Sequence, residues 1–172
     1  KALVLDSLDG GTEAVGFADL RLQTVDHLYR DAMTDITGYD IDESDQIYAA
    51  STGIGKPRRT ILDPDHPRVA SLQRLEASFP EEAVRIVSST RDGKLHLVGT
   101  YSDKNAGTYY LYDQSVGELK YLLARRPWIK EADGYATTDF IFEARDGLQI
   151  TALLTMPELV GDAKAPLVVM PH

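Results

Sequence analysis

The sequence predicts a mainly β fold, made of short antiparallel strands with one helix inserted among them. Alternating or aromatic runs recur between residues 84 and 124 at a spacing of roughly 8 to 12 residues, which is typical of small β-sheets. Asp-Gly pairs at 92–93 and 146–147 separate such runs, and this dipeptide is a strong hairpin signal because glycine accepts a positive φ. Apolar residues follow a helical spacing in the stretch after Pro67.

Taken in chain order, the first 35 residues carry only weak strand signals. Residues 38–41, 46–51 and 59–62 predict a less regular β unit, with a turn at 42–45. The acidic residues of this turn resemble part of a calcium loop. An EF-type loop that begins at Asp40 needs Gly at its sixth position and Glu at its twelfth, where the sequence has Asp45 and Ser51. We therefore predict a solvated turn here and no metal site.

A helix is predicted between this unit and the next. Val69, Leu72, Leu75 and Phe79 recur at helical spacing. Pro67 is suited to the first turn of a helix, where a backbone N–H has no partner in any case, and Pro80 cannot continue the helix. The expected helix has about 12 residues.

The clearest unit is a meander of four strands over residues 84–90, 95–102, 108–112 and 119–124. Four short antiparallel strands cannot bury both of their own faces, and this is the sequence pattern of one β-propeller blade. Paired hairpins of a β-sandwich give a similar pattern. We predict that residues 1–125 hold about two blades of a β-propeller with one inserted helix.

The character of the sequence changes after Ala124. Residues 126–138 include Pro127, Trp128 and a polar run, and they are predicted to form a linker. Residues 139–145 and 148–156 predict a second hairpin, and the apolar residues 166–172 predict a closing strand. Residues 139–172 are therefore expected to form a separate unit. Because the sequence opens and closes within apolar runs, we expect the protein to continue beyond Lys1 and His172.

Three short sequence motifs follow one another along the chain: GTYYLYD at 107–113, ARRPW at 124–128 and FEARDGL at 142–148. The apolar run that ends at His172 completes the set. This order resembles the prolyl oligopeptidase family of serine peptidases, in particular its acylaminoacyl-peptidase and dipeptidyl-peptidase-like branches. The resemblance covers roughly residues 38–172. It implies that residues 1–125 are the C-terminal part of a β-propeller and that residues 139–172 are the first strands of an α/β-hydrolase domain.

The resemblance also implies an activity, the hydrolysis of peptide bonds in oligopeptides, with the propeller restricting access to the active site. Such hydrolases place the nucleophile on a Gly-x-Ser-x-Gly elbow, followed along the chain by Asp and His. The sequence lacks this elbow, and its nearest approach is Ser115, with Asp113 in place of the first Gly. We therefore expect the chain alone to be inactive, with no catalytic residue and no cofactor. In the family, His172 would begin the loop that shapes the oxyanion hole. In this chain, which ends before the glycines of that loop, His172 is predicted to be a frayed terminus, and the start of the oxyanion loop is the alternative interpretation.

Other side chains have two interpretations each. Arg125 and Arg126 are predicted to form an interdomain salt bridge, and contact with a substrate is the alternative. His96 alternates with leucines in a strand, which predicts a solvent-facing or half-buried position. A group of tyrosines is predicted to pack between blades, with a peptide pocket as the alternative: Tyr101, Tyr109, Tyr110, Tyr112 and Tyr121.

Composition narrows the classes of partner. The formal net charge is -9 and the basic residues are scattered, so nucleic acids are not expected as partners. No apolar run approaches the roughly 20 residues that cross a bilayer, so no membrane partner is expected. The absence of cysteine excludes disulfides and thiolate sites but leaves the compartment undetermined. A peptide substrate in the full-length parent is the partner that the resemblance implies.

Two rival interpretations stay open. The first is a non-catalytic β-propeller binding module, and the second is a self-standing small β domain with a native start at Lys1. Whichever holds, the strands at 140–142, 150–154 and 167–170 present unpaired edges in this chain, so we expect an edge-mediated homo-oligomer.

Overall fold

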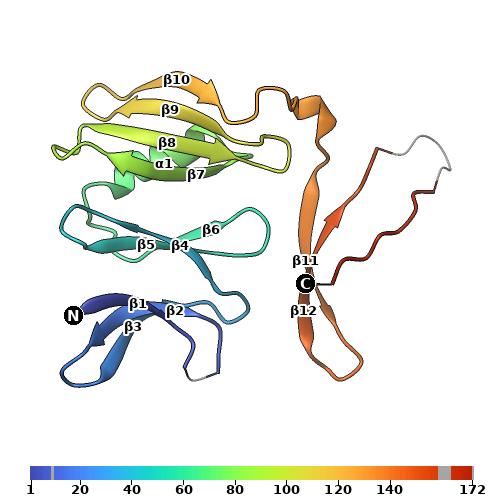
Figure 1. Ribbon diagram of the computed structural model, residues 1–172, viewed down its shortest axis with the longest axis horizontal. Helices are drawn as coiled ribbons and strands as arrows, with labels where there is room; N and C mark the ends of the chain where they lie inside the picture. The colour runs from blue at the N-terminus through green and yellow to red at the C-terminus, as the bar shows by residue number, and fades with distance from the viewer. Residues whose placement is uncertain (9, 159–163, 172) are drawn as a thin grey trace.

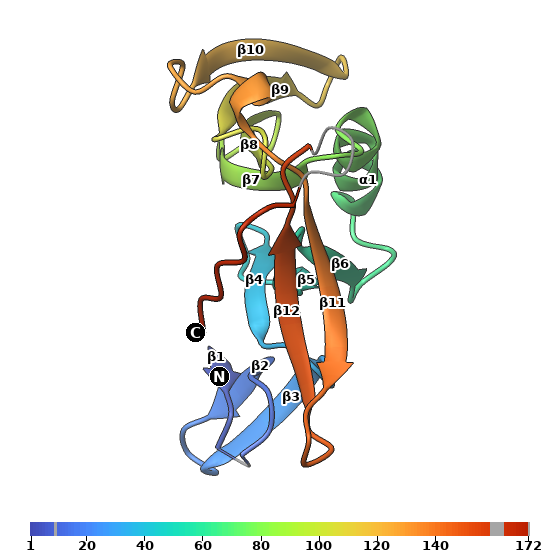
Figure 2. The same cartoon turned by 90° about the vertical axis from the view of Figure 1, so that its right-hand side faces the viewer.

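A computed structural model describes residues 1–8, 10–158 and 164–171, and it confirms a mainly β protein. Three antiparallel sheets follow one another along the chain and lie one above the other (Figure 1). A two-stranded hairpin comes last and runs along the side of these sheets (Figure 2).

The first sheet lies in the part of the sequence where strand signals are weak. It has the order β1-β2-β3, with β1 (Ala2–Asp6), β2 (Ala14–Asp19) and β3 (Thr24–Arg30). Leu3 of β1 lies directly opposite Phe17 of β2, and residues opposite each other in an antiparallel pair have their side chains on the same face of the sheet. Both side chains pack against the apolar cluster shared with the second sheet. These apolar residues explain why the sheet forms.

The second sheet has the order β4-β5-β6, with β4 (Ile36–Ile41), β5 (Ile47–Thr52) and β6 (Arg58–Ile61). Its central strand β5 is buried along its whole length. Ile47 and Ala50 of β5 pack with Val15 of the first sheet. Tyr48 and Ala49 of the same strand pack with Val69 and Leu72 of the helix. The second sheet is therefore the middle layer of the stack.

The predicted helix is confirmed as α1 (Val69–Ser78), with 10 residues. Val69, Leu72 and Leu75 are buried, and Phe79 packs beside them just before Pro80. The apolar stripe lies between the second and third sheets, so one helix contributes to two hydrophobic clusters. No helix in the described ranges is long and apolar enough to cross a membrane.

The third sheet confirms the predicted meander. Its order is β10-β9-β8-β7, with β7 (Ala83–Ser89), β8 (Leu95–Tyr101), β9 (Thr108–Asp113) and β10 (Glu118–Ala124). Gly93 has a φ of 66° in the turn between β7 and β8, a conformation that favours glycine. Val84, Val98 and Tyr112 form the core on the side of the helix.

The chain leaves the third sheet through a short 3-10 turn, η1 (Glu131–Asp133), and enters a second predicted hairpin. This hairpin is confirmed as β11 (Thr137–Glu143) paired with β12 (Gln149–Thr155). Gly147, at the tip, has a φ of 86°. Leu153 and Asp139 lie against Gly55 in the loop between β5 and β6.

The strand predicted at 166–172 is not present in residues 164–171, and His172 lies outside the described residues. Leu167 and Met170 are 82% and 85% exposed. An apolar run favours a strand only where another backbone offers hydrogen bonds. Within the described residues, this segment has no such partner.

Candidate functional site

A crevice lies between the second and third sheets. One part has a volume of about 350 Å³ and is bordered by β4, β6, α1 and β7. A second part, of about 250 Å³, extends toward the turns that follow β4 and β7. Tyr39, Asp40 and Ile86 line both parts, so the two form one region. Polar and charged side chains of α1 and of both sheets meet there.

Arg59 is the central cation of this crevice. Its side chain is 9% exposed, and its Nε donates to Asp40 Oδ2 at 2.9 Å. Its other nitrogens donate to Glu76 of α1 and to the Val84 carbonyl of β7, the latter at 2.8 Å. Arg59 thus joins the second sheet, the helix and the third sheet through one guanidinium. Each of its three guanidinium nitrogens donates a hydrogen bond to another group of the protein.

The predicted solvated turn at 42–45 is organised around the carboxylate of Asp42. Asp42 Oδ1 accepts hydrogen bonds from the Ser44 hydroxyl at 2.7 Å and from the Ser44 and Gln46 backbone N–H groups at 2.8 and 2.9 Å. Burial raises the pKa of Asp42, but these bonds and one from His66 outweigh it, and the net pKa is well below its usual range. The carboxylate acts as a cap for the turn.

His66 fastens this turn to the segment that precedes α1. Its ring stacks on Tyr48 with centroids 4.3 Å apart and planes 7° apart. Nδ1 lies 3.3 Å from the Arg68 backbone N–H, and Nε2 lies 3.3 Å from Asp42 Oδ2. Because the backbone N–H can only donate, Nδ1 accepts and Nε2 carries the proton. The histidine is thereby held as a structural bridge.

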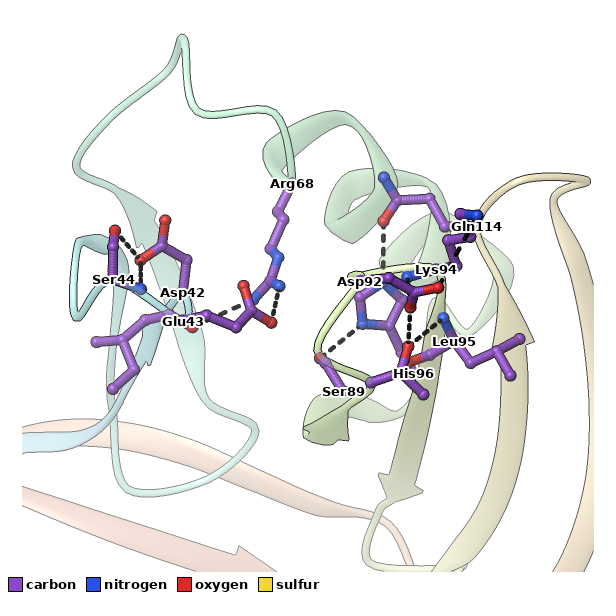
Figure 3. A network of polar contacts seen from close by, with 12 residues as sticks. Asp42, Glu43, Ser44, Arg68, Ser89, Asp92, Lys94, Leu95, His96 and Gln114 are labelled. Atoms are coloured by element: carbon purple, nitrogen blue, oxygen red, sulfur yellow. Dashed lines mark hydrogen bonds and ion pairs between the residues drawn. The ribbon is translucent and has the colours of Figure 1, made fainter.

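Arg68 closes the second part of the crevice (Figure 3). Its guanidinium donates to Glu43, and this bond lowers the pKa of Glu43. Burial lowers the pKa of Arg68, but the bond to Glu43 outweighs it, and the net pKa is raised. Both groups therefore stay charged at neutral pH.

A chain of hydrogen bonds joins Ser89, His96 and Gln114 in the third sheet (Figure 3). Ser89 Oγ lies 2.7 Å from His96 Nδ1, and His96 Nε2 lies 2.9 Å from Gln114 Oε1. The amide oxygen can only accept, so Nε2 donates to it and the serine hydroxyl donates to Nδ1. His96 is 1% exposed, so the expectation of a solvent-facing or half-buried position is wrong. Its two hydrogen bonds compensate for its burial.

The order Ser-His-Gln resembles a catalytic triad only in outline. In a triad, a carboxylate at the third place stabilises the imidazolium that forms when the serine attacks. Gln114 carries no charge and cannot supply that stabilisation. The arrangement is instead suited to holding β7, β8 and the turn after β9 together.

The tyrosine group divides between packing and exposure. Tyr112 is buried, and Tyr110 packs on Phe79 with ring centroids 5.1 Å apart. Tyr121 is 59% exposed and meets the Tyr110 ring edge-on. Within this group of five tyrosines, Tyr101 lines the larger part of the crevice.

The remaining predicted residues lie apart from the crevice. Arg125 and Arg126 are exposed, and neither forms an ion pair within the described residues. Ser115 lies in the turn after β9, where its hydroxyl donates to Asp113 Oδ1 at 2.5 Å. Within the described part of the chain, no group of three or more His, Cys, Asp or Glu side chains is arranged to hold a metal ion.

The bridging roles of Arg59, Arg68 and His66 were not predicted from the sequence. These roles depend on which sheets lie next to each other in the fold. A partial signal was present, since Arg59 lies in a predicted strand and Arg68 directly precedes the first residue of the predicted helical spacing, Val69. Compared with known proteins, the sequence matches no family model and no curated protein.

Proposed function

We propose that this chain is part of a serine peptidase of the prolyl oligopeptidase family, with residues 1–125 as propeller blades and residues 139–172 as the start of an α/β-hydrolase domain. One observation carries the proposal. Three antiparallel sheets stack in chain order, and a hairpin then follows along the side of the stack (Figure 1). A propeller is also built by the repetition of antiparallel sheets.

The sheets support this proposal to different degrees. The third sheet has the four strands of a full blade, whereas the first two have three strands each. In the second sheet, α1 follows β6 at the place in the chain where a fourth strand would stand. We interpret the helix as a substitute for that strand, because Val69 and Leu72 pack against Tyr48 of the sheet.

In this proposal the chain contributes to substrate selection and not to bond cleavage. The parent enzyme would hydrolyse a peptide bond: a serine oxygen attacks the carbonyl carbon, the amine leaves with a proton, and water then releases the acid from the acyl-enzyme. His172 is proposed as the first residue of the oxyanion loop. The groups that do the chemistry would follow it in the chain.

Reading the coding sequence beyond the His172 codon tests the proposal. We expect Gly-Gly-Pro or a close variant directly after His172, and a Gly-x-Ser-x-Gly elbow further on, followed by Asp and His. A stop codon or an unrelated sequence would contradict the proposal. It would favour the rival function, a non-catalytic binding module.

A further inference from the structure

The two faces of the β11–β12 hairpin differ in character. Asp139 and Leu153 share the face that lies against the loop between β5 and β6. Side chains alternate across a strand, so their neighbours in sequence lie on the opposite face of the hairpin, here called the outward face. This outward face carries no charge; Phe140 and Phe142 are 43% and 44% exposed on it, with rings 6.0 Å apart. Its members are Thr138, Phe140, Phe142, Ile150, Ala152 and Leu154.

The outer edge of β12 is unpaired within the described residues. At the tip of the hairpin, the Ala144 N–H donates to the Leu148 carbonyl at 2.8 Å. Hydrogen-bonded and non-hydrogen-bonded residue pairs alternate along an antiparallel ladder. Because the pair 144–148 is hydrogen-bonded, the backbone groups of the even-numbered residues of β12 form the hydrogen bonds to β11. The odd-numbered residues, 149 to 155, direct their N–H and C=O groups outward.

β12 lacks the features that normally protect an edge strand. Its sequence, QITALLT, contains no charged residue and no proline, whereas β11 carries Asp139 and Glu143. The tail does not cover this edge either, since Leu167 to Met170 are 75–85% exposed. Although the chain has a net charge of -9, none of that charge lies on β12.

β12 is also complementary to itself. Two copies running antiparallel, with Ala152 on the two-fold axis, place Ile150 opposite Leu154 of the second copy on the outward face. In the same register all pairs between odd-numbered residues are of the hydrogen-bonded type. This gives about eight backbone hydrogen bonds, because each such pair exchanges two. The outward apolar faces of both copies then become continuous.

We infer that the chain forms a two-fold dimer in which β12 pairs antiparallel with β12 of a second copy. The product is a four-stranded sheet with the order β11-β12-β12-β11. Long-range repulsion between two acidic chains opposes the dimer, and salt screens this repulsion. The dimer is therefore expected to tighten as salt increases.

Sedimentation velocity of the chain at 1–100 μM, combined with hydrogen exchange read by mass spectrometry, tests the inference. A monomer–dimer equilibrium is expected, with protection of amides in 149–155 that increases with protein concentration. A monomer throughout this range would overturn the inference. A dimer whose added protection lies outside 149–155 would overturn it as well.

Two substitutions and a matched control locate the interface. Ala152→Lys places two ammonium groups opposite each other at the axis and is expected to raise the dimer dissociation constant at least tenfold. Thr138→Lys adds the same charge to the same face but on β11, and it should leave the constant within about threefold.

Thr151→Pro keeps the inference testable if Ala152→Lys does not fold. It removes one outward N–H while sparing the bonds to β11, and proline is tolerated on edge strands. We expect a monomer with an unchanged circular dichroism spectrum. A dimer that persists in both Ala152→Lys and Thr151→Pro would contradict the two-fold β12 pairing.

Discussion

At the residue scale, Arg59 connects three elements that are distant in sequence. Its partners are Asp40 in β4, Glu76 in α1 and the Val84 carbonyl in β7. A charged side chain that is this buried is tolerated only with partners, because burying an unpaired charge is costly. The crevice is therefore held at its present width by hydrogen bonds as well as by apolar packing.

Replacing Arg59 with methionine should lower the free energy of unfolding by about 2–4 kcal/mol, because Asp40, 12% exposed, loses its cationic partner. Urea unfolding monitored by tyrosine fluorescence measures the change. Arg58→Met is the matched control, since Arg58 is exposed at the start of the same strand and should change stability by less than about 0.5 kcal/mol. Equal effects of the two substitutions would show that the link through Arg59 contributes nothing.

Asp42 should make stability depend on pH at the acidic end. Its pKa is lower in the folded chain than in the unfolded chain, so its contribution is complete above the unfolded value of about 4. The contribution is lost as pH falls below that value toward the folded pKa. Asp42→Asn should therefore cost about 1 kcal/mol at pH 7 and progressively less below pH 4.

Thermal unfolding of the native chain and of Asp42→Asn between pH 2.5 and 7 measures this difference. Asp45→Asn is the control in the same turn, because Asp45 is exposed and asparagine accepts its φ of 61°. A gap between native and Asp42→Asn that stays constant with pH would contradict the capping role of the carboxylate.

The sequence predicted the turn at 42–45 but not its contact with His66. An acidic turn motif is local, so Asp42 and Ser44 could be placed from the sequence alone. His66 is 24 residues further on, and its stacking on Tyr48 depends on how the segment before α1 returns to the second sheet. His96 was misjudged for the same reason, since burial is a property of the stack and not of strand alternation.

At the scale of elements, local patterns predicted α1, the third sheet and the β11–β12 hairpin. The first sheet was predicted only as weak strand signals, because β2 has a glycine, Gly16, in the middle of its strand. A side-chain carbon at Gly16 would lie 2.4 Å from the Asp26 carbonyl oxygen of β3. The close approach of β2 and β3 requires glycine, and no periodic pattern reveals it.

The segment that joins the third sheet to the hairpin should be the first site of proteolysis. Trp128 is 74% exposed, and η1 is the segment's short stretch of regular structure. Exposed backbone with few buried contacts opens at low cost and is cut early. Brief digestion with trypsin should cut after Lys130, and chymotrypsin after Trp128, as read by mass spectrometry of the two products.

The turns of the third sheet provide an internal comparison for this digestion. Lys94 and Lys104 are exposed in those turns, yet the ladder on either side restrains the backbone there. First cuts after Lys94 or Lys104, with residues 127–134 still intact, would show that the boundary between the two units is misplaced.

At the scale of the whole molecule, stacking decides which residues are buried. The middle sheet is covered on both faces, and its strand β5 is buried throughout. The outer sheets each have one neighbour in this chain, which leaves residues such as Val25 and Val87 exposed at 37% and 51%. The sequence predicted the single meander, but the faces that meet are set by long-range packing that no local pattern encodes.

The central proposal is that this chain is a non-catalytic part of a serine peptidase. A fluorophosphonate probe, which labels activated serines, tests it most directly when it is applied to this chain and to the protein extended by its natural downstream sequence. We expect no labelling of the 172-residue chain and labelling of one serine, on a Gly-x-Ser-x-Gly elbow, in the extended protein. Labelling of any serine within the chain, Ser89 included, or an extended protein that takes up no probe, would contradict the proposal.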